Sequence, residues 1–375
     1  MSALKTTASN LIQSLINAAE KASNIARICR ANEELLSLLV QEKSAEEANA
    51  RFEHDFKTLA DVLIQETIKH DVGHLFPELY EHIKGEESPH FTNTLGRSVS
   101  IVVGKNIAET AECLRSILSD HNNAADVLAT EVHRVVDYSA ESLGIIPEMP
   151  ENFDYTNVGI WIDPIDATAE YISGQDNQSS TPSIASTGLD CVTVLIGAYD
   201  LTTGQPIIGV ISQPFNRKLE GNLYQSKVFW SVCLPTLKSN NCASVEQTRS
   251  SSLGIFSTSE NAQLLQKLED QGYKLVFSAG AGHKALKVVT GEVDLYLLTK
   301  GTTFKWDTCA PQAILRSLGG DIFDFSKSMQ EKCGIPLTYF DGDSVESKCN
   351  EGGLIAVKDT QLLENLLQEL SRKEQ

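Results

Sequence analysis

The feature that most constrains the fold is a short apolar run, Val158 to Ile162, that ends directly at two carboxylates, Asp163 and Asp166. A run of this length indicates a buried strand, and the chemistry of α/β proteins gathers at the carboxyl ends of such strands. Pro164 stiffens the turn between the two aspartates, so both can face one cation. The sequence therefore predicts a strand whose end carries two acidic groups.

The residues after this strand predict the start of a helix. Thr168-Ala169-Glu170-Tyr171 can open a helix whose first N–H groups meet a phosphate. A purely structural alternative makes Asp163 a turn residue and Asp166 the N-cap of that helix. Taken alone, an Asp-Pro-x-Asp motif fits the structural alternative better, so the choice depends on the other acidic motifs of the chain.

The N-terminal part of the chain predicts helices and then a hairpin. Residues 8–47 carry apolar side chains at helical spacing and predict two helices. Residues 55–64 also predict a helix, which places Thr58 and Asp61 three positions apart on one face. Residues 200–204 form a turn sequence between two apolar runs and predict a β-hairpin.

Residues 238–252 are polar and poor in bulky apolar side chains, so we expect them to link two lobes, residues 1–237 and residues 253–375. Beyond this linker, apolar runs alternate with helical patterns, which is typical of an α/β lobe. The predicted strands are residues 253–257, 293–298 and 354–357, and the predicted helices are residues 259–269, 283–290, 308–318 and 360–371.

The charge and the cysteine content argue against several classes of function. A net charge of −19 repels nucleic acid and anionic lipid, and the chain has no basic tract interleaved with aromatic residues. The eight cysteines are scattered without metal-ligand spacing, and we find no signal peptide or membrane-spanning run. We therefore expect a cytoplasmic protein with reduced thiols and with neither a nucleic-acid nor a membrane partner. An anionic substrate could approach only through a local positive patch, which carboxylate-bound metals would supply.

Two further acidic motifs accompany the strand motif. Glu86 and Glu87 follow an apolar helix end, where an isolated acidic pair is usually a solvated loop. Asp307 precedes a helical stretch that ends at Gly319-Gly320, so it could be merely a helix cap. It could also be a metal ligand, because a hard cation takes several oxygen ligands.

A glycine-rich segment, Ser278 to Lys284, superficially suggests a phosphate loop. It lacks the Gly-x-x-x-x-Gly-Lys-Ser/Thr spacing, which excludes a Walker motif. Small residues at a helix start leave backbone N–H groups accessible, and Lys284 adds a positive charge one turn into the helix. A second anionic group of a substrate could therefore dock there.

Together these motifs resemble the signature set of a known family. An acidic pair, then Asp-Pro-Ile-Asp-x-Thr, then Trp-Asp before a helix ending in Gly-Gly, is similar to the family of inositol monophosphatase, fructose bisphosphatase and the bisphosphate nucleotidases. Over nearly the whole chain the resemblance is closer still to the inositol polyphosphate 1-phosphatase branch. The segments that carry it are residues 55–61, 85–88, 191–197, 257–260 and 302–307.

The resemblance implies a fold of the α/β (α+β) class, a layered α-β-α-β-α sandwich. An antiparallel sheet would lie in the N-terminal lobe and a smaller mixed sheet in the C-terminal lobe. The first lobe would supply most metal ligands, and the second would supply Asp307 and most substrate contacts.

The resemblance also implies a reaction, which is magnesium-dependent hydrolysis of the 1-phosphate of inositol 1,4-bisphosphate or inositol 1,3,4-trisphosphate by a monomer. Two or three Mg²⁺ ions would activate a water for in-line attack, and Li⁺ would inhibit. The implied metal ligands are Glu86, Glu87, Asp163, the Ile165 carbonyl, Asp166 and Asp307. The implied catalytic pair that polarises the water is Asp61 and Thr168. The implied substrate contacts are Asp166, Ala167, Thr168, Ser259, Gly280, Ala281, Lys284 and Thr302.

Three positions depart from the pattern of the family. Ala167 stands where relatives usually carry Ser or Gly, and Asn261 stands where a Lys is expected beside a substrate phosphate. The second departure removes a positive charge and so bears on substrate preference. Pro311 is unusual near the start of the Asp307 helix, although a proline in the first turn is tolerated.

Two alternative functions stay open at this point. A 3′(2′),5′-bisphosphate nucleotidase would share every metal ligand and replace the inositol with an adenosine. A non-catalytic regulator that binds metal or phosphate could have kept the fold. The complete set of metal carboxylates, with Asp61 and Thr168 added, argues against the regulator.

Overall fold

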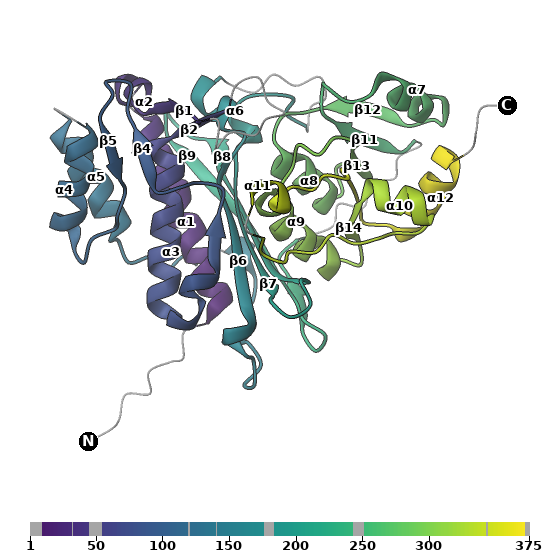
Figure 1. Cartoon of the computed structure of the whole chain (residues 1–375), viewed down its shortest axis with the longest axis horizontal. Coiled ribbons are helices and arrows are strands. Elements are labelled where there is room, and N and C mark those ends of the chain that lie inside the picture. Colours follow the sequence, from purple (N-terminus) through teal and green to yellow (C-terminus); the bar gives the residue numbers. More distant parts are fainter. Residues whose placement is uncertain are drawn as a thin grey trace.

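The structure is a computed structural model, in which two β-sheets alternate with three layers of helices (Figure 1). It describes residues 10–31, 33–44, 55–118, 121–139, 141–175, 184–242, 251–342 and 344–371. The predicted α-β-α-β-α layering is confirmed.

Each layer of helices covers the face of a sheet. α1 (Leu11–Arg30) and α3 (Leu59–Leu75) pack on the outer face of the larger sheet. α8 (Ala281–Val289) and α9 (Lys305–Ser317) lie between the two sheets, and α12 (Thr360–Ser371) packs on the outer face of the smaller sheet. The outer layer also contains α7 (Ala262–Asp270) and α10 (Phe325–Glu331).

The larger sheet has six strands in the order β10-β9-β8-β7-β6-β3. The strands are β3 (Ile83–Gly85), β6 (Val158–Asp166), β7 (Thr193–Asp200), β8 (Pro206–Lys218), β9 (Tyr224–Cys233) and β10 (Lys238–Asn240). Neighbours from β10 to β6 are antiparallel, as predicted, and β7 and β8 form the predicted hairpin. β3 pairs parallel to β6, so the sheet as a whole is mixed.

The smaller sheet has five strands in the order β12-β11-β13-β15-β14. The strands are β11 (Leu253–Phe256), β12 (Lys274–Phe277), β13 (Leu295–Leu298), β14 (Asp321–Asp324) and β15 (Leu354–Val357). β12, β11 and β13 are parallel and the other pairings are antiparallel, so the predicted mixed sheet is confirmed. The three strands predicted here from apolar runs are β11, β13 and β15.

The packing of α9 on the larger sheet depends on two glycines. A Cβ on Gly197 of β7 would lie 2.5 Å from the backbone nitrogen of Ala310, and a Cβ on Gly209 of β8 would collide with the Ala310 carbonyl. Because both positions lack a side chain, the backbone of α9 approaches the sheet closely. All nine residues of β6 are buried, since α3 and α9 cover its two faces.

The start of the chain corrects two sequence predictions. Within residues 8–47, α1 and α2 (Glu33–Leu38) are helical, but Val40–Glu42 is a strand, β1. Residues 55–64 are not one helix, because β2 (Phe56–Thr58) pairs antiparallel with β1 and α3 starts only at Leu59. Thr58, the last residue of β2, has an extended backbone and caps α3 with its side chain, so the helix cannot extend back through it.

The remaining elements connect these layers or lie at the edge of the first lobe. They are β4 (His90–Thr92), β5 (Ser98–Ser100), α4 (Ile107–Leu118), α5 (Asn122–Val132), α6 (Thr168–Ser173), α11 (Val345–Lys348) and four 3₁₀ turns at Pro77–His82, Glu141–Leu143, Tyr155–Asn157 and Leu189–Cys191. No helix in the described ranges is long and apolar enough to cross a membrane.

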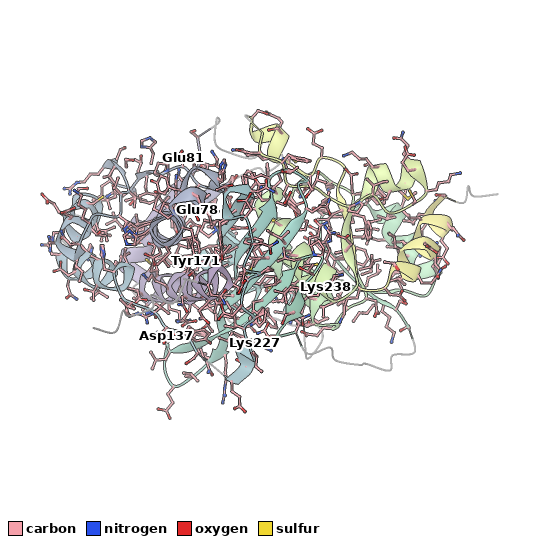
Figure 2. All side chains as sticks on the ribbon, turned by 90° about the horizontal axis from the view of Figure 1, so that it is seen from below. Glu78, Glu81, Asp137, Tyr171, Lys227 and Lys238 are labelled. Atoms are coloured by element: carbon pink, nitrogen blue, oxygen red, sulfur yellow. The ribbon has the colours of Figure 1, made fainter. Side chains whose placement is uncertain are left out.

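The core of the first lobe encloses side chains from distant parts of the chain. Figure 2 shows Tyr171 of α6 inside this lobe, whereas Asp137 and Lys227 lie nearer its edge. The Tyr171 hydroxyl donates to the Ala26 carbonyl of α1 at 2.9 Å. β10 falls within the predicted linker 238–252, and residues 243–250 of that linker lie outside the described ranges. The lobe boundary therefore stays a prediction.

Candidate active site

The two aspartates of the Asp-Pro-Ile-Asp motif lie within β6 rather than beyond it. β6 runs on to Asp166, with a bulge against β7 between Asp163 and Asp166. Pro164 sits in this bulge, where its missing N–H costs no ladder hydrogen bond. The next residue, Ala167, is left-handed with φ 68° and is the N-cap of α6. The structural alternative that made Asp166 the N-cap is therefore wrong.

Asp166 is held by the start of α8, which comes from the other lobe. Its carboxylate accepts hydrogen bonds from the N–H groups of Ala281 (3.0 Å) and Gly282 (2.9 Å) and from the Thr193 hydroxyl (3.1 Å). The prediction that the start of this helix leaves its N–H groups open to a substrate is therefore wrong for Ala281 and Gly282. Gly280 has φ +75°, and a Cβ there would lie 2.9 Å from Asp166 Oδ2.

Asp307 reaches the same place from α9. The helix begins at Lys305, three residues earlier than predicted, so Asp307 is in its first turn and accepts a hydrogen bond from the Phe304 N–H at 2.5 Å. Pro311 consequently lies in the helix interior and not in the first turn, where it removes one backbone donor. Asp307 therefore closes the first turn of α9 and faces the end of β6.

Asp163, Asp166 and Asp307 form the group of acidic residues that could hold a metal ion in the described part of the chain. Each offers a carboxylate oxygen within 4.8 Å of the others. Asp163 Oδ1 is buried and has no hydrogen-bond partner among the described residues. Buried carboxylate oxygens without partners fit a hard divalent cation.

The protonation of these aspartates depends on their burial and on one another. Burial raises the pKa of Asp163 well above its ordinary value, and the charges of Glu86, Asp166 and Asp307 raise it further. Burial and the charge of Asp166 likewise raise the pKa of Asp307 well above its ordinary value. Carboxylates packed this closely repel one another, and a bound cation would relieve that repulsion.

The acidic pair Glu86-Glu87 is fixed against β6 by backbone hydrogen bonds. The Glu86 N–H donates to the Ile162 carbonyl at 3.1 Å, and the Gln65 side chain of α3 bonds both the N–H and the carbonyl of Glu87. Burial raises the pKa of Glu87 to about 8. The pair is therefore part of a built site and not a solvated loop.

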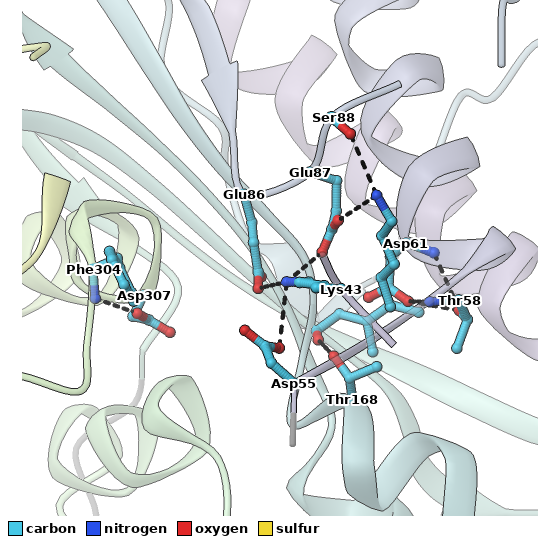
Figure 3. Close-up of polar contacts among 12 residues, drawn as sticks. Lys43, Asp55, Thr58, Asp61, Glu86, Glu87, Ser88, Thr168, Phe304 and Asp307 are labelled. Carbon is cyan, nitrogen blue, oxygen red and sulfur yellow. Dashed lines mark hydrogen bonds and ion pairs between the residues drawn. The ribbon is translucent and has the colours of Figure 1, made fainter. Parts of the chain in front are cut away.

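Lys43 joins this acidic pair, although no sequence motif marks it. Its ammonium lies 2.5 Å from Glu86, 2.8 Å from Glu87 and 3.6 Å from Asp55 (Figure 3). Burial lowers the pKa of Lys43, but the three carboxylates outweigh burial and raise it. Lys43 is the residue after β1, and the pairing of β1 with β2 places its side chain next to the acidic pair.

Asp61 and Thr168, the predicted catalytic pair, lie on the same side of Lys43 in Figure 3. One carboxylate oxygen of Asp61, Oδ2, accepts from the Thr58 N–H at 2.7 Å and from the Thr58 hydroxyl at 2.6 Å. The other, Oδ1, is buried without a partner in the described structure. The Thr168 hydroxyl donates to the Ile165 carbonyl at 3.0 Å. Burial raises the pKa of Asp61 to about 7, although the bonds from Thr58 lower it.

These groups surround one cavity of about 700 Å³ between the lobes. Of the predicted site residues, those that line it are Glu86, Glu87, Asp163, Ile165, Asp166, Ala167, Thr168, Gly280, Ala281, Lys284, Thr302 and Asp307. Asp61 lies buried behind this lining, and Ser259 does not line the cavity, although its neighbours Ser257 and Thr258 do.

Comparison with known proteins identifies the family. The sequence profile of the inositol monophosphatase family matches residues 11–374. The chain belongs to the inositol monophosphatase family. The predicted membership, and with it the predicted relationship to a family of phosphatases, is confirmed.

Individual members of the family differ in how much of this chain they match. Inositol polyphosphate 1-phosphatase of Bos taurus is 38% identical over 96% of this chain and 97% of its own length. 3′(2′),5′-bisphosphate nucleotidase 1 of Dictyostelium discoideum is 29% identical over 50% of this chain and 60% of its own length. The solved structure of suhB from Bartonella henselae covers 96% of this chain and 98% of its own, with a TM-score of 0.53 and 14% identity, and so shows the shared fold.

Two departures from the family pattern have local structural explanations. Asn261 is the N-cap of α7, and its side chain accepts from the N–H groups of Gln263 (2.9 Å) and Leu264 (3.1 Å). A lysine cannot make this cap. Ala167 has φ 68°, in the left-handed region that glycine adopts more readily than alanine does.

Lys284 is the one predicted cationic substrate contact. It is buried, donates to the Ser278 carbonyl at 3.1 Å and lies over the ring of Tyr296. Burial lowers its pKa, although the charge of Asp166 raises it. Lys284 lines the cavity next to the aspartates, where its charge partly offsets theirs.

Proposed function

We propose that this chain is a magnesium-dependent phosphatase that removes the 1-phosphate from soluble inositol polyphosphates, such as inositol 1,4-bisphosphate and inositol 1,3,4-trisphosphate. The proposal rests on one observation: Asp163 and Asp166 of β6 and Asp307 of α9 lie close together and line one cavity. The similarity to inositol polyphosphate 1-phosphatase over 96% of the chain supports the substrate class.

The residues that would hold the metal are Glu86, Asp163, the Ile165 carbonyl, Asp166 and Asp307, with Glu87 beside them. Bound magnesium would activate a water molecule and offset the charge that develops on the leaving oxygen. Its ligands come from β6, from the loop after β3 and from α9, so the site forms only when both lobes pack together.

Asp61 would take the proton of the attacking water. Asp61 Oδ1 is buried and unpartnered, while Thr58 fixes the other oxygen of the same carboxylate. In its ionised form Asp61 can accept the proton while Thr168 helps to orient the water. The water oxygen would bond to phosphorus as the bond from phosphorus to the inositol 1-oxygen breaks. The inositol 1-oxygen would take a proton from solvent to become a hydroxyl, and inorganic phosphate would leave without a phosphoenzyme.

The remaining parts of the proposal follow the resemblance. Lithium would inhibit by replacing one magnesium ion after the reaction, and the enzyme would act as a cytoplasmic monomer. The nucleotidase is the less favoured function, because the bisphosphate nucleotidase of Dictyostelium discoideum matches only half of the chain.

The test is phosphate release from inositol 1,4-bisphosphate with magnesium, comparing the wild type with Asp163→Asn. Magnesium-dependent release of only the 1-phosphate, lost in the variant, supports both the function and the site. Turnover of adenosine 3′,5′-bisphosphate in place of the inositol substrate would move the chain to the nucleotidases. No turnover of either would favour the non-catalytic regulator.

A further inference from the structure

The cavity is lined by three lysines in the described ranges, and two of them are committed to protein groups. They are Lys43, Lys284 and Lys348. Lys43 is paired with three carboxylates. Lys284 is buried and donates to the Ser278 carbonyl beside the aspartates. Neither is therefore available to bind a remote part of a substrate without losing its present partners.

Lys348 differs from both in its surroundings. It is the last residue of α11 and is only partly buried. The structure gives it no carboxylate within ion-pairing distance in the described part of the chain. Its ammonium instead lies 5.9 Å from the ring centroid of Trp161 on β6. A lysine that faces a cavity from an aromatic surface keeps its charge open to an incoming anion.

The residues next to Lys348 fix its position at the cavity. Cys349 forms an isolated β-bridge with Phe304. Asn350 is buried, its N–H donates to the Thr303 carbonyl at 2.8 Å, and its side chain donates to the Phe304 carbonyl at 2.9 Å. The backbone that carries Lys348 is therefore tied to the segment that leads into Asp307.

The size and the charge of the cavity indicate what Lys348 would bind. A volume of about 700 Å³ falls in the range of ~300–1,000 Å³ that holds a whole small ligand, and so exceeds the need of one phosphate group. The carboxylates of the site would repel any further phosphate of such a ligand unless a free cation faced it. Asn261 supplies no such cation, because its side chain is an uncharged amide, which here caps α7.

We propose that Lys348 is a substrate-binding residue whose ammonium takes a phosphate of the substrate other than the one that is cleaved. This inference rests on the proposed function, because it assumes a substrate with at least two phosphates. It makes α11 a determinant of selectivity for polyphosphates over monophosphates.

The experiment compares Lys348→Gln and Lys348→Arg with the wild type on inositol 1,4-bisphosphate and on inositol 1-phosphate. Loss of one charged contact should raise KM for the bisphosphate about tenfold to hundredfold with little change in kcat. The KM for the monophosphate should change far less, and Arg should restore most of the selectivity. Lys227→Gln is the matched control, because Lys227 also lies over an aromatic ring, that of Phe229, at the edge of the first lobe (Figure 2).

An equal KM change for both substrates, or none for either, would overturn the proposal about Lys348 while wild-type turnover still supports the function. If the wild type cleaves adenosine 3′,5′-bisphosphate instead, the proposed function fails, and the same variants on that substrate still test Lys348. If the wild type cleaves neither bisphosphate, binding of both is measured by calorimetric titration into the wild type and Lys348→Gln. Weaker binding by the variant supports the proposal. Equal binding by the two proteins, or no binding by either, contradicts it.

Discussion

Thr58 donates two hydrogen bonds, at 2.6 and 2.7 Å, to a single carboxylate oxygen of Asp61 and leaves the other oxygen buried without a partner in the described structure. These bonds belong to the capping box at the start of α3, so the cap of a helix also orients the carboxylate of a proposed catalytic residue. Without these two hydrogen bonds the Asp61 carboxylate would be free to rotate. With them, it presents Oδ1 in a fixed direction.

We predict that Asp61→Asn lowers kcat by about 10²–10⁴-fold, because an amide cannot accept the proton of the attacking water. The measurement is steady-state phosphate release at saturating magnesium, with the melting temperature as a check on folding. Asp137→Asn, at an exposed position, is the control (Figure 2). A variant that folds and retains more than a tenth of the wild-type kcat would exclude Asp61 as the base.

The raised pKa of Asp61 predicts how stability without metal depends on pH. Because the pKa of Asp61 is about 7 in the folded protein and 3.8 for an ordinary aspartate, the folded protein holds the proton more tightly than the unfolded chain does. In chelator, stability should therefore fall as pH rises from about 4 to about 7, by up to a few kcal/mol for this group. Chemical denaturation across that range should give a shallower decline for Asp61→Asn, and an identical decline would contradict the assignment.

Magnesium should stabilise the protein through the three aspartates. A ligand at about 100 times its dissociation constant adds about 2.7 kcal/mol to the free energy of unfolding. We expect the melting temperature to rise with magnesium in the wild type and to rise much less in Asp163→Asn and Asp307→Asn. Retention of the full magnesium shift in both variants would show that the ion binds elsewhere.

Gly280 should tolerate no side chain. At φ +75°, an added Cβ would lie 2.8 Å from the Cys191 carbonyl oxygen and 2.9 Å from Asp166 Oδ2, so it would displace the aspartate. We expect Gly280→Ala to lower the free energy of unfolding by about 1–3 kcal/mol and to raise the magnesium concentration needed for activity. Gly96→Ala is the matched control, because Gly96 has φ +78° with open space around it. Equal effects of the two substitutions would mean that backbone strain alone is responsible.

Lithium inhibition is the remaining prediction. A small monovalent ion in a carboxylate site can replace one magnesium ion after cleavage and hold the product in place. Millimolar lithium should therefore reduce turnover at saturating magnesium and inositol 1,4-bisphosphate, and the inhibition should deepen as substrate rises. The same salt concentration with sodium or potassium controls for ionic strength. Turnover that is equal in all three salts would refute this prediction.

The acidic residues could be predicted from the sequence because each belongs to a short motif with its own local meaning. Asp163, Asp166 and Asp307 stand at the end of a strand or the start of a helix, and the structure brings them together. Lys43 could not be predicted, because the pairing of β1 with β2 brings it to Glu86 and no local pattern marks it.

The wrong predictions about helices also arise from contacts between segments that are distant in the sequence. The prediction extended the helical pattern of residues 59–64 back over residues 55–58, which instead pair with β1 and end at the Thr58 cap, so a strand contact outside the segment decides their conformation. The N–H groups of Ala281 and Gly282 looked free because their partner, Asp166, lies over a hundred residues away in sequence. Hydrogen-bond partners at such separations follow from the packed fold and not from spacing.

The close packing of α9 on Gly197 and Gly209 also limits where the chain could be divided into separately expressed parts. Leu195, Ile211 and Phe229, from three strands of the larger sheet, belong to the apolar cluster that α9 completes. Expressed alone, the first lobe would expose this face to water, and such a face promotes aggregation. We therefore expect the two halves to unfold together, so recombination between relatives would have to exchange α9 together with the strands beneath it.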